Sequence, residues 1–263
     1  MIYDLEDVSF AYEADQRALA GVTLKVAPGE RIALLGANGS GKSTLMRLLD
    51  ALSFPTAGRM SAAGQALSEQ ALADEAVNHA FRRRVGFVFQ NPDVQLFNAT
   101  VFDELAFGPL QLGWARPRII AAVDQALETF GIADLRSRPP HRLSGGEKKR
   151  VALAATLITE PEVLLLDEPT NALDPESRTI LVDLLCSART DGKTIIVATH
   201  DLEVAEAVTR RTVILAKGRV AADGETRAVL HDLDLLRRTH LLRSHWHVGS
   251  DGRPVAHAHP HRH

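Results

Sequence analysis

Hydrophobic residues along this chain occur mainly in short unbroken runs, separated by longer segments in which they recur with helical spacing. Five of these runs predict strands that are buried on both faces of a sheet: 32–35, 85–89, 163–166, 194–198 and 212–215. Segments of helical period lie between most of these runs, which is typical of a mostly parallel sheet covered by helices. The pattern therefore predicts an α/β fold.

The N-terminal segment, residues 2–24, departs from this pattern because it holds two short strand-like pieces, which we expect Gly21 to separate. Pro28 and Gly29 then predict a turn into the core. Near the end of the sheet, Lys217 and Gly218 lie between apolar runs and predict a β-hairpin. We therefore expect an N-terminal antiparallel β-subdomain beside the main sheet.

Strand signals stop between residues 91 and 160. Three stretches in this region have helical period instead, 102–110, 119–130 and 147–159, and glycine or proline residues separate them. This predicts a helical subdomain of about residues 91–160 inserted into the α/β core. The polar segment after Glu225 is also expected to be helical.

Composition limits what this chain can be. Of its 263 residues, 45% are hydrophobic, which is enough for a sizeable core, and the formal net charge is −3. Because nucleic-acid-binding proteins normally carry a basic excess, we expect no nucleic-acid partner. The single cysteine, Cys186, favours a reducing compartment. We find neither a signal peptide nor an apolar run near the ~18–20 residues that span a bilayer, so any membrane role is expected to depend on a partner.

A glycine-rich loop follows the first predicted core strand and fits the phosphate-binding pattern G-x-x-x-x-G-K-[ST]. It consists of Gly36, Ala37, Asn38, Gly39, Ser40, Gly41, Lys42, Ser43 and Thr44. The glycines let successive backbone N–H groups point at phosphate oxygens, and the helix that follows adds a partial positive charge. We expect Lys42 to reach the β- and γ-phosphates of a nucleotide and the Ser43 hydroxyl to ligate Mg²⁺.

Polar residues also end three other predicted strands. Asp167 and Glu168 follow the run 163–166, at the strand end where α/β sheets bind ligands. We expect Asp167 to hold Mg²⁺ through its water shell and Glu168 to polarise the attacking water. His200 is expected on the γ-phosphate side of the site, and Gln90 is expected to ligate Mg²⁺ or the nucleophilic water. A lone histidine at such a position is more often structural, and a lone glutamine is a weak signal.

A second candidate anion site precedes the third helical stretch and consists of Ser144, Gly145, Gly146 and Glu147. Ser144 and Glu147 have the spacing of a capping box, which alone explains helix initiation. The two glycines are not needed for a cap, but they allow close approach of a ligand to the backbone. Either the chain binds two anions, or two chains pair head-to-tail and share each nucleotide. The capping role and the binding role are compatible.

Together these segments resemble ATP-binding-cassette (ABC) ATPases, in which the same motifs occur in the same order, and the resemblance covers about residues 1–235. It implies a P-loop NTPase core of the RecA-like type that hydrolyses ATP with Mg²⁺. It also implies a pair of ATPase subunits, either two copies of this chain or this chain with a paralogue. Tyr12 resembles the aromatic residue that stacks on adenine, and Asp174 resembles the acid that links the two sites across the dimer.

Residues 91–97, followed by Thr100, Val101 and 107–109, resemble more narrowly the energy-coupling-factor branch of this family. That resemblance implies a transmembrane coupling protein, a substrate-binding membrane protein and a location on the cytoplasmic face of the cell membrane. Leu96, Phe97 and Phe102 either offer the membrane partner an apolar groove on the helical subdomain or pack the subdomain's own core.

Seven of the eleven histidines lie between His240 and His263. The last four alternate with other residues and are His257, His259, His261 and His263. Because this alternation is a poor former of helix or strand, we expect residues 241–263 to be a flexible tail after an ABC ATPase domain of residues 1–240. Imidazole suits Ni²⁺ and Co²⁺, so the tail is either a weak metal site or a solvated segment without a role.

The branch resemblance and the tail together favour an importer of cobalt or nickel. One alternative is the same machinery importing a vitamin such as biotin. A second is a soluble ABC ATPase of DNA repair or of the ribosome, although such proteins carry a long coiled coil or a second cassette, and this chain has one cassette with a short helical insertion.

Overall fold

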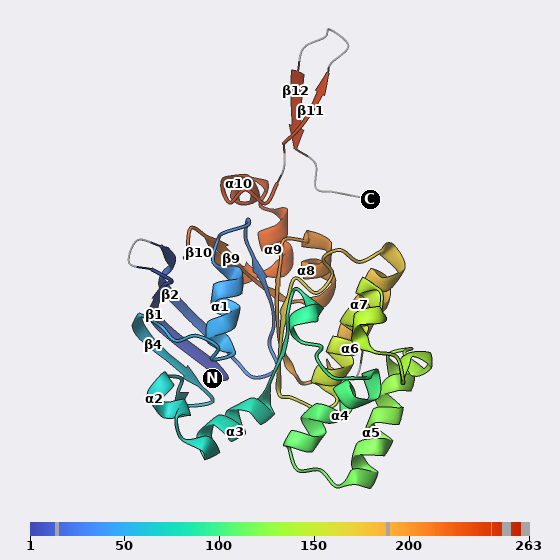
Figure 1. Ribbon diagram of the computed structural model, residues 1–263. Coiled ribbons are helices and arrows are strands. Elements are labelled where there is room, and N and C mark those ends of the chain that lie inside the picture. Colours follow the sequence, from blue (N-terminus) through green and yellow to red (C-terminus); the bar gives the residue numbers. More distant parts are fainter. Residues whose placement is uncertain (14–15, 188–189, 243, 249–253, 259–263) are drawn as a thin grey trace.

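A six-stranded sheet forms the centre of the molecule (Figure 1). In spatial order its strands are β10 (Arg219–Glu225), β9 (Arg211–Ala216), β3 (Arg31–Leu35), β8 (Thr194–Thr199), β7 (Val163–Asp167) and β6 (Val85–Val88). All neighbours are parallel except β9 and β10, which form the hairpin predicted at Lys217 and Gly218. This computed structural model describes residues 1–13, 16–187, 190–242, 244–248 and 254–258, the last two ranges by their backbone alone.

All five predicted core strands are present in the central sheet, and their side chains pack on both of its faces. Every residue of β7 and β8 is buried. Leu165 and Ile196 pack into the hydrophobic cluster on one face, while Leu164 and Ile195 pack into the cluster on the other. Burial on both faces explains why these strands read as unbroken apolar runs rather than alternating ones.

An antiparallel sheet at the N-terminus has the strand order β2-β1-β4-β5, which confirms the predicted β-subdomain. Its strands are β1 (Tyr3–Ala11), β2 (Arg17–Val26), β4 (Ala57–Ala62) and β5 (Gln65–Ala66). The prediction that Gly21 separates the first two strands is wrong, since Gly21 lies inside β2. There it adopts φ +74° where the register with β1 is irregular, and a Cβ would lie 2.7 Å from Asp7 Oδ1. The glycine therefore marks a bulge rather than a turn.

Helices cover both faces of the central sheet, and a group of three forms the predicted helical insertion. These three are α4 (Val101–Gln111), α5 (Arg116–Thr129) and α6 (Gly145–Leu157), which lie together at the lower right of Figure 1. The other helices are α1 (Lys42–Leu49), α2 (Glu69–Leu72), α3 (Glu75–Arg84), α7 (Pro175–Cys186), α8 (Leu202–Val208), α9 (Thr226–His231) and α10 (Leu233–Arg238). Short 3-10 turns lie at η1 (Pro92–Val94), η2 (Ala133–Leu135) and η3 (Pro140–Arg142).

Part of the C-terminal segment, which we expected to be a flexible tail of poor strand-forming sequence, is extended. Strands β11 (Ser244–Val248) and β12 (Pro254–Ala258) pair antiparallel, with His245 opposite His257. Tryptophan and valine residues in these stretches favour extended backbone, which the histidine alternation alone did not indicate. In the part of the chain that the structure describes, no helix is both long enough and apolar enough to cross a membrane.

Candidate functional site

Parallel strands bring the predicted polar residues to one edge of the sheet. Strand β8 lies between β3 and β7, and β6 is the next neighbour of β7. The carboxyl ends of four consecutive strands therefore lead into the glycine-rich loop, His200, the acidic pair and Gln90. A cavity of about 620 Å³ opens beside this edge. Its lining comprises Tyr12, Gln16, Arg17, Ala18, Asn38, Gly39, Gly41, Lys42, Ser43, Thr44, Gln90 and Glu168.

The loop of residues 36–44 has the form of a phosphate cradle. Gly41 caps α1 with φ +107°, and a Cβ there would lie 2.7 Å from Ala18 O. At Gly39, by contrast, the space beyond the backbone is open and φ is +78°. Lys42 is only 6% exposed, and its Nζ donates a hydrogen bond to Gly36 O at 2.7 Å. Burial lowers the pKa of Lys42, while the carboxylates of Glu168 and Asp167 oppose that shift.

Glu168 is buried against the lysine and the predicted histidine. Its Oε1 lies 3.9 Å from Lys42 Nζ and 3.0 Å from His200 Nδ1. The Thr199 hydroxyl donates a hydrogen bond to Oε2 at 3.2 Å. Glu168 also has φ +44°, a left-handed conformation that is rare for residues other than glycine. The carboxylate is thus held close to the phosphate-binding lysine, where a general base for water is required.

Asp167 meets the requirements of a magnesium ligand. Burial raises the pKa of Asp167, and a hydrogen bond from the Ser43 side chain opposes this increase. Its Oδ1 is buried and has no hydrogen-bond partner among the described residues. Carboxylate, hydroxyl and amide oxygens are the ligands that Mg²⁺ prefers, and Ser43 and Gln90 line the adjoining cavity. The residues present therefore fit the ion.

The predicted second anion site lies at the first turn of α6 and contributes nothing to the lining of this cavity. Ser144 and Glu147 form a complete capping box, in which Ser144 N donates to Glu147 Oε2 at 2.7 Å. A Cβ on Gly146 would lie 2.5 Å from Ser177 Oγ, so packing within the chain explains that glycine. Around Gly145 the space is open, and no contact with the described residues requires a glycine there.

Asp174 lies beside this turn, as the N-cap of α7. Its two carboxylate oxygens accept hydrogen bonds from Ser177, one from the backbone N–H at 2.9 Å and one from the hydroxyl at 2.8 Å. These bonds lower the pKa of Asp174. The first turns of α6 and α7 are therefore neighbours, joined through Gly146 and Ser177.

Tyr12 is half-exposed at the mouth of the cavity. Its hydroxyl lies 3.1 Å from Thr44 Oγ1, and its ring packs edge-on against Phe10. Gln16 and Arg17 lie in the same lining but were not predicted, because polar residues at and before the start of a strand carry no motif. Lys149, which is buried in α6 and whose pKa burial lowers to about 8, was not predicted either.

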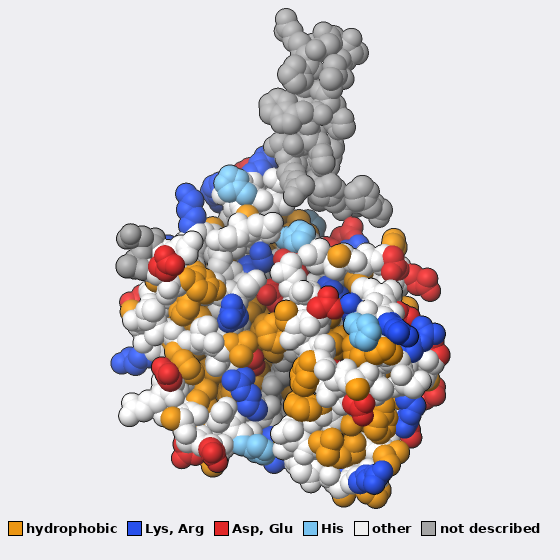
Figure 2. Space-filling model, in the orientation of Figure 1, with side chains coloured by type: hydrophobic (Ala, Val, Ile, Leu, Met, Phe, Trp, Pro, Cys, Tyr) orange, Lys and Arg blue, Asp and Glu red, His pale blue; other side chains and the backbone are white. Residues whose placement is uncertain are grey.

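The residues suggested for an apolar groove do not share one environment. Leu96 is buried in the core of the insertion, and Phe102 packs partly buried against that core with Arg136 over its ring. For these two the packing alternative is correct. Phe97 is 67% exposed and contacts Phe107 edge-on. Val94 and Leu110 are also exposed, and Figure 2 shows hydrophobic side chains gathered over the region of α4 and α5.

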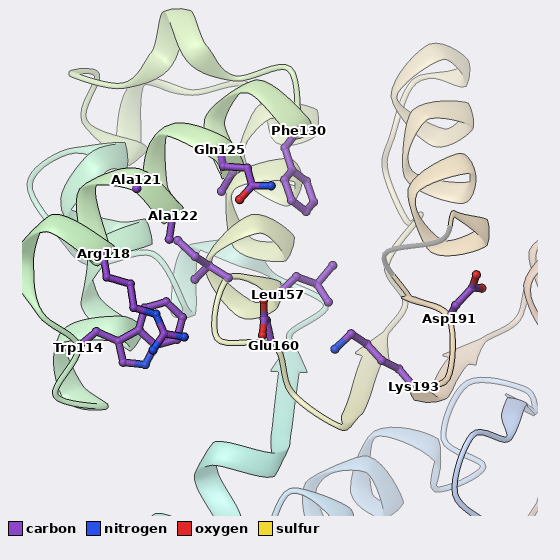
Figure 3. Close-up of a pocket in the computed structure, with 12 residues that line it drawn as sticks. Trp114, Arg118, Ala121, Ala122, Gln125, Phe130, Leu157, Glu160, Asp191 and Lys193 are labelled. Atoms are coloured by element: carbon purple, nitrogen blue, oxygen red, sulfur yellow. The ribbon is translucent and has the colours of Figure 1, made fainter.

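A second cavity, of about 650 Å³, lies between α5 and the loops that precede β7 and β8. The predicted site residues are absent from its lining. Arg118 stacks on Trp114 at 3.6 Å, and Figure 3 shows this pair on one side of the cavity with Lys193 pointing toward it from the other. Since no phosphate-binding loop or acidic pair lies here, we assign the chemistry to the cavity at the carboxyl edge.

The predicted transition-metal residues of the tail fall largely beyond the described part of the chain. His259, His261 and His263 lie outside the described residues, and only the backbone of His257 is described, in β12. Their role as metal ligands stays a prediction.

Comparisons with known proteins agree with this geometry. The family model described as "ABC transporter" matches residues 19–171. The nickel import ATP-binding protein NikO of Rhodobacter capsulatus is 57% identical over 243 residues, which are 91% of this chain and 95% of that protein. An energy-coupling factor transporter ATP-binding protein, EcfA2 of Methanospirillum hungatei, is 41% identical over 91% of this chain and 59% of its own length.

Two solved structures share the fold. The cbiO1 protein from Clostridium perfringens, described as part of the ABC transporter complex cbiONQ, aligns with a TM-score of 0.76 and 35% identity. The alignment covers 91% of this chain and 94% of that one. The ATP-binding cassette MJ0796, a dimer in a post-hydrolysis state with ADP and Pi, aligns with a TM-score of 0.77 and 29% identity over 86% of this chain and 99% of that one.

Proposed function

This chain belongs to the ABC transporter family and is an ATP hydrolase, and from that premise we propose that it powers the import of nickel or cobalt ions. The observation that carries the proposal is the 57% identity, over 91% of the chain, with a protein named for nickel import. The concentration of histidines between His240 and His263 supports a transition metal as cargo, because imidazole is a ligand that these ions favour.

Hydrolysis is proposed to use the residues at the carboxyl edge of the sheet. Backbone N–H groups of residues 36–44 and the Lys42 ammonium bind the phosphates of ATP. Glu168 accepts a proton from the attacking water, and His200, 3.0 Å from its carboxylate, keeps that carboxylate oriented toward the γ-phosphate. Tyr12 stacks on the adenine from the mouth of the cavity.

Ser43, Asp167 and Gln90 are the residues proposed to hold Mg²⁺. When bound, Mg²⁺ neutralises the charge that develops on the phosphate oxygens. The unpartnered Oδ1 of Asp167 and its position beside Ser43 support this assignment.

Two ATPase subunits are proposed to close on each nucleotide, as two copies of this chain or as this chain with a paralogue. Ser144, Gly145 and Gly146 of one subunit then contact the phosphates held by the loop of the other. The open space at Gly145 supports this role, since packing within one chain does not account for that glycine. Asp174, beside the same turn, links the two pockets.

A transmembrane coupling protein is proposed to dock on the helical subdomain at the cytoplasmic face of the membrane, together with a substrate-binding membrane protein. The exposed residues Val94, Phe97, Phe107 and Leu110 support this placement, because clustered exposed apolar side chains are typical of interaction sites.

Uptake by cells that express this chain with its membrane partners tests the proposal. We expect accumulation of radiolabelled nickel or cobalt, and loss of that accumulation with Glu168→Gln, which keeps the size of the side chain but removes the base. The purified variant should still bind ATP. Uptake of radiolabelled biotin without uptake of either metal would assign a vitamin as cargo and contradict the metal proposal, whereas hydrolysis by Glu168→Gln at the wild-type rate would contradict the assignment of the base.

A further inference from the structure

Lys149 lies in the second turn of α6, and only 6% of it is exposed. Its Nζ donates hydrogen bonds to three backbone oxygens: Glu168 O at 3.0 Å, Pro169 O at 3.0 Å and Asn171 O at 2.8 Å. A lysine ammonium has three N–H donors, so all three serve one loop. No motif assigns this side chain a task.

The loop that Lys149 holds contains two residues in unusual backbone conformations. Glu168 has φ +44° and Ala172 has φ +59°, and such left-handed residues typically cost about 1 kcal/mol or more each. From the strand side, Glu168 N donates to Ala198 O at 2.8 Å. The surrounding structure must therefore impose this conformation: Ala198 holds the N–H of Glu168 from one side, and Lys149 holds the carbonyl oxygens of Glu168, Pro169 and Asn171 from the other.

Burying an ammonium in this place is expensive, since burial disfavours the charged form and lowers the pKa of Lys149, while the carboxylates of Glu168 and Asp167 oppose the shift. An apolar side chain would fill the same volume without that cost. The charge and its three donors therefore point to a task beyond packing.

We propose that Lys149 is a positioning residue for ATP hydrolysis: it holds residues 168–171 so that the Glu168 carboxylate stays beside Lys42 and His200, and it joins this loop to α6. Because Ser144 caps the start of α6, the Lys149 side chain connects the turn proposed to contact the partner's nucleotide with the proposed base, Glu168, of its own pocket. This inference rests on the proposed role of Glu168.

The test measures kcat, the affinity for ATP and the melting temperature of the purified full-length chain. Lys149→Met keeps an unbranched side chain one atom shorter than lysine and removes all donors, whereas Lys149→Arg keeps the charge and several donors. The matched control is Lys193→Met, because Lys193 Nζ also donates to a backbone carbonyl, Pro161 O at 2.7 Å, but at the opposite end of β7.

For Lys149→Met we expect a loss of about 10- to 100-fold in kcat, since a displacement of about 1 Å at a reacting group can cost that much, with ATP affinity within about threefold. Lys149→Arg should recover a substantial part of the loss, and Lys193→Met should keep the wild-type kcat. A folded Lys149→Met with unchanged kcat, or one that loses kcat and ATP affinity equally, would overturn the inference. If Lys149→Met does not fold, the same criteria apply to Lys149→Gln.

Glu168→Gln in the same assay separates this inference from the proposed function. If Glu168→Gln abolishes turnover while Lys149→Met does not, only the positioning role fails. If Glu168→Gln hydrolyses ATP at the wild-type rate, Glu168 is not the base, and the positioning role of Lys149 is contradicted with it.

Discussion

At the scale of single residues, the site depends on ionisable side chains that burial keeps close together. Lys42, Asp167 and Glu168 are each about 6% exposed. In this environment opposite charges interact strongly, but each charge is costly if its partner is removed. The Lys42 ammonium and the Glu168 carboxylate, 3.9 Å apart, therefore stabilise each other until a phosphate enters.

Another buried acid, Asp50, lies at the C-terminal end of α1, the helix that follows the phosphate-binding loop. Its carboxylate lies 3.4 Å from Arg82, yet burial raises its pKa to about 7. The folded chain therefore keeps a proton on Asp50 at pH values where the unfolded chain has released it. Between about pH 4 and pH 7 unfolding releases this proton, so stability falls as pH rises across that window.

Asp50→Asn should remove this pH dependence. We expect the free energy of unfolding of the wild type, relative to that of Asp50→Asn, to fall by an amount on the order of 3 kcal/mol between pH 4 and pH 7. Urea denaturation at several pH values measures the difference. The exposed Asp183 gives the control variant Asp183→Asn, which should follow the wild type. Parallel curves for wild type and Asp50→Asn would contradict a raised pKa.

At the scale of elements, the start of α6 has the capping role that the structure shows and the nucleotide-binding role that we propose, and experiment can separate the two. As a cap, Ser144 is worth about 1 kcal/mol. Ser144→Ala should therefore lower the melting temperature by only about 2–4 °C. If Ser144 also contacts the partner's nucleotide, ATP turnover should fall by more than tenfold, which lost capping alone does not explain.

Ser68→Ala provides the control for this experiment, because the Ser68 side chain also caps a helix, α2, where it accepts a hydrogen bond from Ala71 N at 3.2 Å without a reciprocal bond. It should cost comparable or less stability and leave turnover unchanged. Equal turnover in Ser144→Ala and Ser68→Ala would restrict Ser144 to capping.

The elements that the sequence predicted are those with the strongest patterns. Strands such as β7 are buried on both faces and read as unbroken apolar runs, and α4, α5 and α6 each bury a helical face. The strands β4 and β5 escaped prediction because they are short and mostly exposed. Gly21 was assigned to a turn because a glycine within a strand and a glycine between strands look alike in sequence.

That Lys42, Asp167 and Glu168 lie close together was predictable, because motifs fix both their residue type and their position at a strand end. Contacts that join distant segments without such motifs were not predictable. Lys149 reaches carbonyl oxygens about twenty positions away in sequence, and backbone oxygens leave no trace in the residue pattern. Exposure was not predictable either, since Phe97 is exposed and Leu96 is buried although the two are adjacent and apolar.

At the scale of the whole molecule, the cavity at the carboxyl edge and the turn proposed to contact a partner's nucleotide do not meet within one chain. The cavity at the carboxyl edge has Lys42 and Glu168, while the Ser144 turn lies outside its lining. A second subunit that places its own Ser144 turn over this cavity would complete the site, and would complete the partner's site by symmetry. We therefore propose that activity belongs to a pair of subunits.

The most direct test of this claim is the rate of ATP hydrolysis per chain, measured with Mg²⁺ over a wide range of protein concentration, both for this chain alone and for this chain mixed in equal amounts with a paralogue. We expect the rate per chain to be near zero at the lowest concentrations, to rise as pairs form and to level off when pairing is complete. A rate per chain that stays constant and high down to concentrations at which the protein is monomeric would contradict the account.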